Sequence, residues 1–175
     1  IIEKNNFEIT TDYLNNELQK TTEQLPLEIH LDELVEEAQI FKINPGSYLN
    51  LKEALKSCDK EKVINYIKNL LENFKYITIS YIRENLNQEF DYENSNFYYD
   101  TLVKIISKEN NWIFKKKYLS KERFDPEELD EKIKNSYDMN LNINENYSKM
   151  PKNIGISMLE IMDLRRQLSE NYKIN

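Results

Sequence analysis

The chain has few of the residues on which common catalytic and metal sites depend. It contains one cysteine, Cys58, and one histidine, His30, which are too few for a zinc site of four Cys or His ligands or for an internal disulfide. A Ser/His/Asp or Cys/His arrangement would rest on His30 alone, which sits between Ile29 and Leu31. We therefore expect no catalytic residues, no metal and no cofactor.

Glycine and proline are also scarce, with two and four copies. Gly46 and Gly155 stand far apart, and neither G-x-x-x-x-G-K-[ST] nor G-x-G-x-x-G occurs, so no glycine-rich phosphate loop is expected. Low glycine and proline content favours long helices joined by short polar loops. The sequence therefore predicts a mainly α fold without a glycine-rich linker.

Long hydrophobic runs are missing as well. No stretch of about 18 apolar residues occurs, and the N-terminus lacks the basic and then apolar pattern of a secretion signal, so we expect no membrane partner. A single cysteine fits a reducing compartment, which predicts an intracellular location, cytoplasmic or nuclear (nucleoid). Because the first residue is Ile1, we expect the chain to be a piece of a longer protein.

Apolar spacing predicts three segments along the chain. The first, residues 1–58, is expected to be an acidic helical layer with helices over Asp12–Gln24 and around Leu31–Phe41, a turn at Asn44–Ser47, and a short helix over Leu49–Ser57. Proline followed by glycine is typical of the corner of a turn.

The second segment, residues 59–124, is expected to be winged-helix-like, meaning a helix-turn-helix followed by a short β wing. The firmest helix follows Asp59, where apolar residues recur with helical spacing. Two helices over Thr78–Gln88 and Ser95–Glu109 come next, and Trp112–Tyr118 is expected to be the first strand of the wing. A helix continuing through Trp112–Tyr118 is the alternative, but asparagines at 110 and 111 favour a break, since asparagine tolerates the left-handed conformation.

The third segment, residues 125–175, is expected to close the core with helices. Asp125 and Pro126 form a helix start, with Asp125 accepting from the N3 amide. Asp138–Asn153 is rich in asparagine and aperiodic, which favours a mobile loop or an internal boundary. Ile156–Tyr172 predicts a closing helix with a wide apolar band that either packs within its own domain or meets a partner helix. A helical layer before a winged helix is similar to the arrangement in PCI-type scaffold subunits, a fold-level analogy.

Charge is unevenly distributed. Residues 1–50 carry ten acidic and three basic side chains, a balance of −7 that equals the net charge of the chain, whereas residues 95–123 carry +4. The densest acidic cluster is a solvated face or a docking patch for a basic partner, and it comprises Asp32, Glu33, Glu36 and Glu37. The contact surface expected on the basic segment, for a protein or for nucleic acid, comprises Asn96, Tyr99, Lys104, Lys108, Lys115, Lys116, Lys117, Lys121 and Arg123.

Three functions follow from these patterns. The leading hypothesis is a non-enzymatic protein–protein interaction or scaffold module, because catalytic residue types are scarce and an acidic body would repel a duplex beyond the basic segment. The first alternative is a winged-helix regulator that contacts DNA through residues 95–123. The second is an enzyme that uses carboxylates only, which would need a pocket with two convergent acids.

Overall fold

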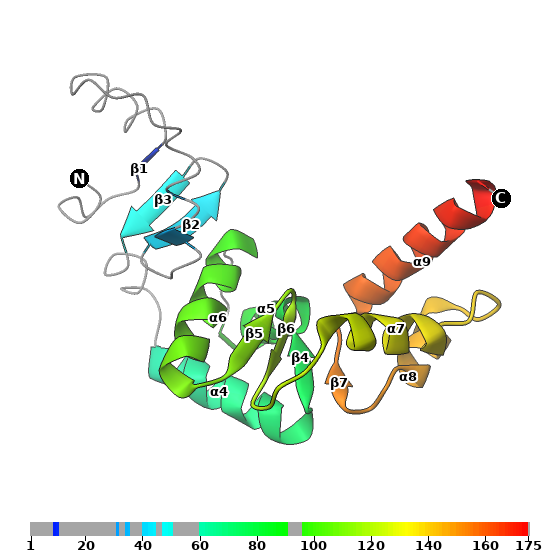
Figure 1. Ribbon diagram of the computed structural model, residues 1–175, viewed down its shortest axis with the longest axis horizontal. Helices are drawn as coiled ribbons and strands as arrows, with labels where there is room; N and C mark the ends of the chain where they lie inside the picture. Colours follow the sequence, from blue (N-terminus) through cyan, green and yellow to red (C-terminus); the bar gives the residue numbers. More distant parts are fainter. Residues whose placement is uncertain are drawn as a thin grey trace. The chain divides into compact units, whose positions relative to one another are not determined.

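The computed structural model describes residues 9–10, 31, 34–35, 40–44, 47–50, 60–90 and 96–174. Over these residues the chain is mainly helical, with six helices and two small β-sheets, which confirms the mainly α prediction at this level (Figure 1). The chain divides into two compact units. Unit 1 takes its described residues from Ile1–Asn65 and Tyr92–Glu109, and unit 2 from Tyr66–Asp91 and Asn110–Asn175.

Unit 1 contains a three-stranded antiparallel sheet near the N-terminus. Strands β1 (Ile9–Thr10), β3 (Ser47–Asn50) and β2 (Ile40–Asn44) pair in that order, and β2 and β3 pair closely enough for Asn44 to oppose Ser47. The prediction of a helical layer over residues 1–58 is therefore wrong for the residues that lie in these strands. Two short apolar runs, Ile40–Ile43 and Tyr48–Leu49, lie on either side of the Asn-Pro-Gly-Ser sequence. Short apolar runs joined by turn residues are typical of a hairpin, and that signal outweighs helical spacing here.

Two of the predicted N-terminal helices are affected by this sheet. Phe41 lies in β2, and Leu49 lies in β3, so neither belongs to a helix. The helix expected around Leu31 is confirmed where it is described, since Leu31, Leu34 and Val35 are helical and pack with two buried strand residues, Ile40 and Tyr48. The helix expected over Asp12–Gln24 lies outside the described residues, as do His30 and Cys58.

Helix α4 (Lys60–Asn73) confirms the firmest helix prediction. Its apolar residues follow the 3.6-residue period, so one face of the helix is buried, and that face comprises Val63, Ile67, Leu70 and Leu71. Helix α6 (Asn96–Asn110) also agrees with its prediction to within one residue at each end. Asn111 follows it with φ 56°, the left-handed conformation expected of a helix-ending asparagine.

Unit 2 is built on a mixed four-stranded sheet in the order β5-β6-β4-β7 (Figure 1). Its strands are β4 (Tyr76–Thr78), β5 (Ile113–Lys115), β6 (Tyr118–Ser120) and β7 (Ile154–Gly155). β4 pairs antiparallel with β6 and parallel with β7, while β5 and β6 form an antiparallel hairpin. Trp112–Tyr118 is therefore neither one strand nor a helix, because the chain reverses at residues 116 and 117.

Helix α5 (Ile79–Phe90) begins directly after β4. It starts one residue later and ends two residues later than the predicted helix over Thr78–Gln88. Helix α7 (Pro126–Ser136) starts as predicted, with Asp125 as N-cap and Pro126 in the first turn. The capping bond differs by one residue, since Asp125 Oδ1 accepts from the amide of Glu127, the N2 position.

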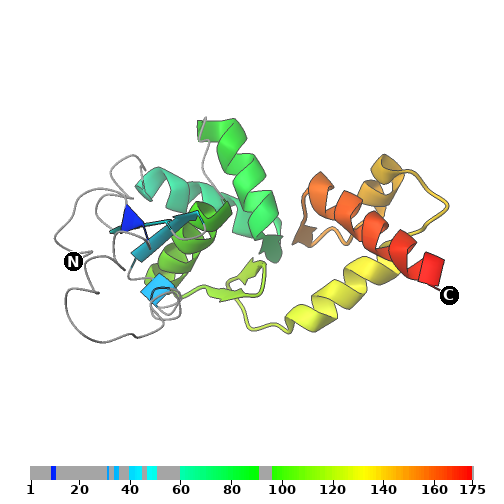
Figure 2. The ribbon, with the colours of Figure 1, turned by 90° about the horizontal axis from the view of Figure 1, so that it is seen from above.

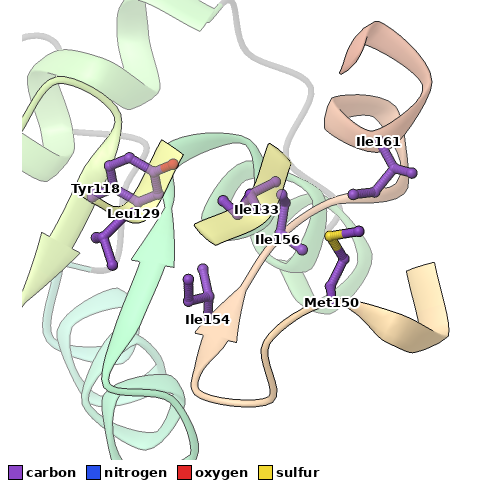
Figure 3. Close-up of a cluster of buried hydrophobic side chains, with 7 residues drawn as sticks. All are labelled: Tyr118, Leu129, Ile133, Met150, Ile154, Ile156 and Ile161. Carbon is purple, nitrogen blue, oxygen red and sulfur yellow. The ribbon is translucent and has the colours of Figure 1, made fainter. Parts of the chain in front are cut away.

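The core of unit 2 joins the hairpin to the C-terminal segment. Figure 3 shows its seven buried side chains, which come from β6, α7, the turn after α8, the β7 segment and α9: Tyr118, Leu129, Ile133, Met150, Ile154, Ile156 and Ile161. Leu129 and Ile133 are one helical turn apart on α7, so both face inward, as predicted for them. Burying several such side chains, each worth about 1.5–3 kcal/mol, fixes α7 and α9 against the sheet.

Asp138–Asn153 contains a helix where a mobile loop was expected. Helix α8 (Ile143–Lys149) has a capping box, in which the Asn142 side chain accepts from the amide of Glu145 and the Glu145 carboxylate accepts from the amide of Asn142. Asn-x-x-Glu is a recognised helix-start pattern, and its local hydrogen bonds overcome the low helix propensity of the asparagines. The loop prediction was therefore wrong.

Helix α9 (Met158–Ile174) confirms the predicted closing helix, two residues later than expected. Figure 2 shows the courses of α7 (yellow) and α9 (orange to red), and residues of both helices line a common cleft. The wide apolar band is only partly buried: Ile161 is fully buried, whereas Leu159 and Met162 are 48% and 52% exposed.

Candidate functional site

The turn of the β5–β6 hairpin presents two lysines at the mouth of a cleft in unit 2. Lys115 pairs with Tyr118, so Lys116 and Lys117 form a two-residue turn. Lys116 has φ 56°, a left-handed conformation that such turns usually give to glycine or asparagine. A lysine in this conformation is strained, which indicates that its side-chain contacts hold the turn.

Those contacts are ion pairs with helix α7. Lys116 Nζ lies 2.6 Å from Glu127 Oε2 and 3.1 Å from Asp130 Oδ2. Lys117 Nζ lies 3.7 Å from Asp130 Oδ1 and 3.4 Å from Glu160 Oε1 on α9. Two of the six lysines expected to contact a partner, Lys116 and Lys117, are therefore paired with acids within unit 2.

Asp130 also joins the turn to the core through Tyr118. The Tyr118 hydroxyl donates a 2.6 Å hydrogen bond to Asp130 Oδ1. Burial of Asp130 acts to raise its pKa, but the hydrogen bonds from Tyr118 and Lys116, together with the charge of Lys117, outweigh burial and lower the pKa below its usual value. Burial and the Asp130 charge raise the pKa of Tyr118. Near neutral pH, Asp130 is ionised and Tyr118 keeps its proton.

Glu160 is a second acidic centre, at the start of α9. Its Oε2 accepts from Thr78 Oγ1 at 2.5 Å and from the amide of Ser157 at 3.1 Å, and its own amide donates to Ser157 Oγ at 3.3 Å. Ser157 and Glu160 thus form a capping box. Oε1 is buried without a hydrogen bond in the described part of the chain and faces the charge of Lys117.

These groups line a cleft of about 690 Å³ between the hairpin turn, α7 and α9. Its walls carry three lysines, four acids and an apolar floor, which are Lys116, Lys117, Lys134, Asp130, Glu131, Glu160, Asp163, Ile133, Ile156 and Leu164. Lys116 and Lys117 both pair with Asp130, and Lys117 also lies 3.4 Å from Glu160 Oε1. These ion pairs anchor the hairpin turn to α7 and α9.

The cations that remain lie along the hairpin. Lys115, Lys121 and Arg123 are exposed and have no acidic partner among the residues that the structure describes. Lys115 stands at the turn end of the hairpin and Lys121 follows its other end, so they are separated by the length of a short strand. We call these three residues the hairpin cations.

Helix α6 carries less free charge than its sequence suggests. Lys104 Nζ lies 3.3 Å from Asp100 Oδ2, and Glu109 Oε1 lies 2.5 Å from Lys60 Nζ. The helix therefore has no excess of positive charge: within residues 95–109 two acids balance two bases, and the whole +4 lies in residues 110–123.

Exposure on α6 differs from the prediction at Tyr99. Tyr98, Leu102, Ile105 and Ile106 are buried. Tyr99, which was expected to contact a partner, is only 1% exposed, and Ser107 is 3% exposed, so the buried face of α6 is wider than a narrow stripe. Lys108 is exposed, and the side chain of Asn96 lies outside the described ones.

The acidic patch lies outside the described residues, since Asp32, Glu33, Glu36 and Glu37 all fall there. Where the structure does describe the chain, no three His, Cys, Asp or Glu side chains are placed to hold a metal ion. None of the helices described is long and apolar enough to cross a membrane.

Sequence reasoning missed the residues that organise the cleft. Tyr118, Asp130 and Glu160 come from β6, α7 and α9, so only the fold brings them together. One signal was readable: Ser157-x-x-Glu160 before an apolar run is a capping-box pattern. No protein-family model, curated protein or solved structure matches the chain.

Proposed function

We propose that this chain is a protein-docking module, built on a winged helix, that binds an extended acidic segment of another protein through the hairpin cations. The winged helix would comprise α4, β4, α5, α6, β5 and β6. Two observations support the winged helix. These elements follow one another as helix, strand, helix, helix, strand, strand, and the strands pair antiparallel in the order β5-β6-β4. An experimental structure that places α6 against this sheet is the direct check.

The observation that carries the docking role is the internal neutralisation of the basic segment. Lys116 and Lys117 pair with acids of α7 and α9, and α6 carries no excess charge. Three hairpin cations remain. Three phosphate contacts would give a salt slope of only about −2.7, whereas proteins that bind DNA tightly make roughly six to ten such contacts.

The hairpin also offers a backbone edge. β5 is the outermost strand of its sheet and has β6 as its one neighbour among the described strands. An extended segment can add beside such an edge by main-chain hydrogen bonds, while alternate side chains set specificity. Side chains two residues apart are roughly 7 Å apart along a strand, so alternating acids would meet the cations at the two ends of the hairpin.

The test uses a ten-residue peptide that alternates glutamate with valine, its glutamine analogue, and a 20-bp DNA duplex. Binding of each to the wild type and to Lys115→Glu/Lys121→Glu/Arg123→Glu is measured by fluorescence anisotropy over a salt series. The matched control, Lys68→Glu/Lys132→Glu/Lys134→Glu, makes the same charge change at exposed lysines of α4 and α7.

We expect the glutamate peptide to bind the wild type and the control variant but not the hairpin variant. The glutamine analogue should bind none of the three proteins. The duplex should bind weakly, with a slope no steeper than about −3. Tight DNA binding with a slope beyond about −5 would support the DNA-binding alternative instead. Equal loss of peptide binding in the control would remove the hairpin cations from the proposal.

A further inference from the structure

A second pocket in unit 2 is walled by aromatic rings. It has a volume of about 210 Å³ and lies between the end of α4, helix α5 and the segment that runs from α8 to β7. Its aromatic walls are Phe74, Tyr81 and Tyr147, and its remaining lining is Met150, Pro151, Lys152, Ile154, Gly155 and Ile156. Ile156 lines both this pocket and the charged cleft, and the other lining residues of the pocket do not line the cleft.

The walls are set at a steep angle to one another. The rings of Phe74 and Tyr81 have centroids 5.4 Å apart and an interplanar angle of 73°, so they form a corner. The ring of Tyr81 lies against Gly155, where an added Cβ would be 2.9 Å from Ile77 Cγ2 and 3.0 Å from the ring, so a larger residue would force one of these side chains to move. Tyr147 is 36% exposed and forms the open side of the pocket.

Electrostatics at the pocket favour a cation. Aromatic faces carry negative potential. Burial raises the pKa values of Tyr81 and Tyr147, and the Glu84 carboxylate raises both further, so both rings stay neutral and a negative charge lies nearby. The one cation in the lining, Lys152, donates to the Ser148 carbonyl at 2.8 Å, which holds its ammonium at the end of α8.

We propose that the pocket walled by Phe74, Tyr81 and Tyr147 binds the trimethylammonium group of a methylated lysine on a partner protein. Methylation removes the N–H donors that favour water and enlarges the cation, so its positive surface can contact the aromatic walls of the pocket. A phosphocholine headgroup carries the same cation, but its phosphate would be repelled by the Glu84 charge that acts on Tyr81 and Tyr147. This site is separate from the hairpin cations, and either can fail without the other.

The first experiment compares a cation with its uncharged isostere. Choline and 3,3-dimethylbutan-1-ol have the same shape, and binding of each is followed by NMR shifts of the Tyr81 and Tyr147 rings. We expect choline to bind about tenfold more tightly than the alcohol, because the cation–π attraction is absent in the alcohol. Equal binding would identify an ordinary apolar cavity and overturn the proposal.

The second experiment fixes the source of the cation. A short peptide in which trimethyllysine is the one charged side chain is compared with the same peptide bearing unmodified lysine, and with vesicles of phosphatidylcholine. We expect the trimethyllysine peptide alone to bind. Binding to the vesicles but not to the peptide, or equal binding of the two peptides, would overturn the assignment to methylated lysine.

Variants separate a direct role from a structural one. Tyr147→Phe should retain binding, Tyr147→Ala should lose it, and Glu84→Gln should weaken choline several-fold without affecting the alcohol. Leu159→Ala, an exposed change on α9, is the control and should bind as the wild type does. If Tyr147→Ala bound choline as tightly as the wild type, the pocket would not be the site, whatever the outcome for the hairpin cations.

Discussion

The hydroxyl of Tyr118 donates to Asp130 Oδ1 at 2.6 Å, which joins a fully buried strand residue to the acid that also neutralises Lys116 and Lys117. One carboxylate thereby connects the core, the hairpin turn and α7. The shape of the hairpin, and with it the placement of the hairpin cations, depends on this contact.

Removing the Tyr118 hydroxyl should destabilise unit 2. Tyr118→Phe leaves the ring in the core and removes a hydrogen bond to an ionised acceptor, a bond worth about 1.5–3 kcal/mol. Because Asp130 keeps its two lysine partners, we expect the lower part of that range in urea unfolding. A loss below about 0.5 kcal/mol would mean that water replaces the hydroxyl without cost. Tyr137→Phe, whose hydroxyl accepts or donates no hydrogen bond among the described residues, is the control.

The same contact predicts a pH dependence. The pKa of Asp130 is lower in the folded chain than its ordinary value of 3.8, so the unfolded state binds the proton more readily. The contribution of Asp130 is therefore fully present above about pH 4 and is lost as the pH falls through the lower folded pKa. The stability difference between the wild type and Asp130→Asn should shrink from pH 6 to pH 3. A difference that stays constant would contradict the lowered pKa.

Glu160 and Thr78 should be energetically coupled. Thr78 is fully buried, and its hydroxyl donates to Glu160 Oε2, so removing the acid alone leaves a buried donor unsatisfied. We expect Glu160→Ala to cost about 2–3 kcal/mol, and Thr78→Val to reduce that cost by about 1 kcal/mol in a double-mutant cycle. Glu170→Ala on the exposed side of α9 should change stability little. Additive effects of the two changes would show that the hydrogen bond contributes nothing.

Helix positions followed from the sequence because burial on a helix leaves a regular trace. The apolar residues of α4 recur every three or four positions, and Asp125-Pro126 and Asn111 mark helix ends through their own side-chain and backbone preferences. These effects depend on residues that are close together in the sequence, so the sequence alone is enough to predict the helices and their ends.

The sheets and the site were harder to foresee because they depend on residues far apart in the chain. β4 is three residues long and pairs with β6 (Tyr118–Ser120) and β7 (Ile154–Gly155). No local sequence pattern predicts this pairing. The exposed or paired state of each lysine likewise depends on its neighbours in space. Lys115 and Lys116 are adjacent in sequence, yet one is free of acids among the described residues and the other meets two of them.

The strained turn gives a prediction at Lys116. Lys116→Ala removes both ion pairs and keeps a side chain at φ 56°, whereas Lys116→Gly removes the ion pairs and the strain together. We expect the glycine variant to be more stable than the alanine variant in urea unfolding. The reverse order would be expected only if Lys116 were not in the left-handed region. Lys115→Gly is the matched control and should be less stable than Lys115→Ala, since glycine weakens a strand.

Asn146 provides the sharpest stability test, because its side-chain amide forms hydrogen bonds with four backbone groups of residues 138–142. It is fully buried; its Oδ1 accepts from the amide of Asp138, and its Nδ2 donates to the carbonyls of Asp138, Leu141 and Asn142. Asn146→Ala leaves the amide of Asp138 without its acceptor and removes one of the donors to each of the three carbonyls, so we expect a loss of about 2–4 kcal/mol and faster amide exchange over residues 138–150. Asn144→Ala, an exposed position two residues earlier in the same helix, should cost less than about 0.5 kcal/mol. Equal effects of the two substitutions would show that residues 138–150 are held by packing and not by the Asn146 amide.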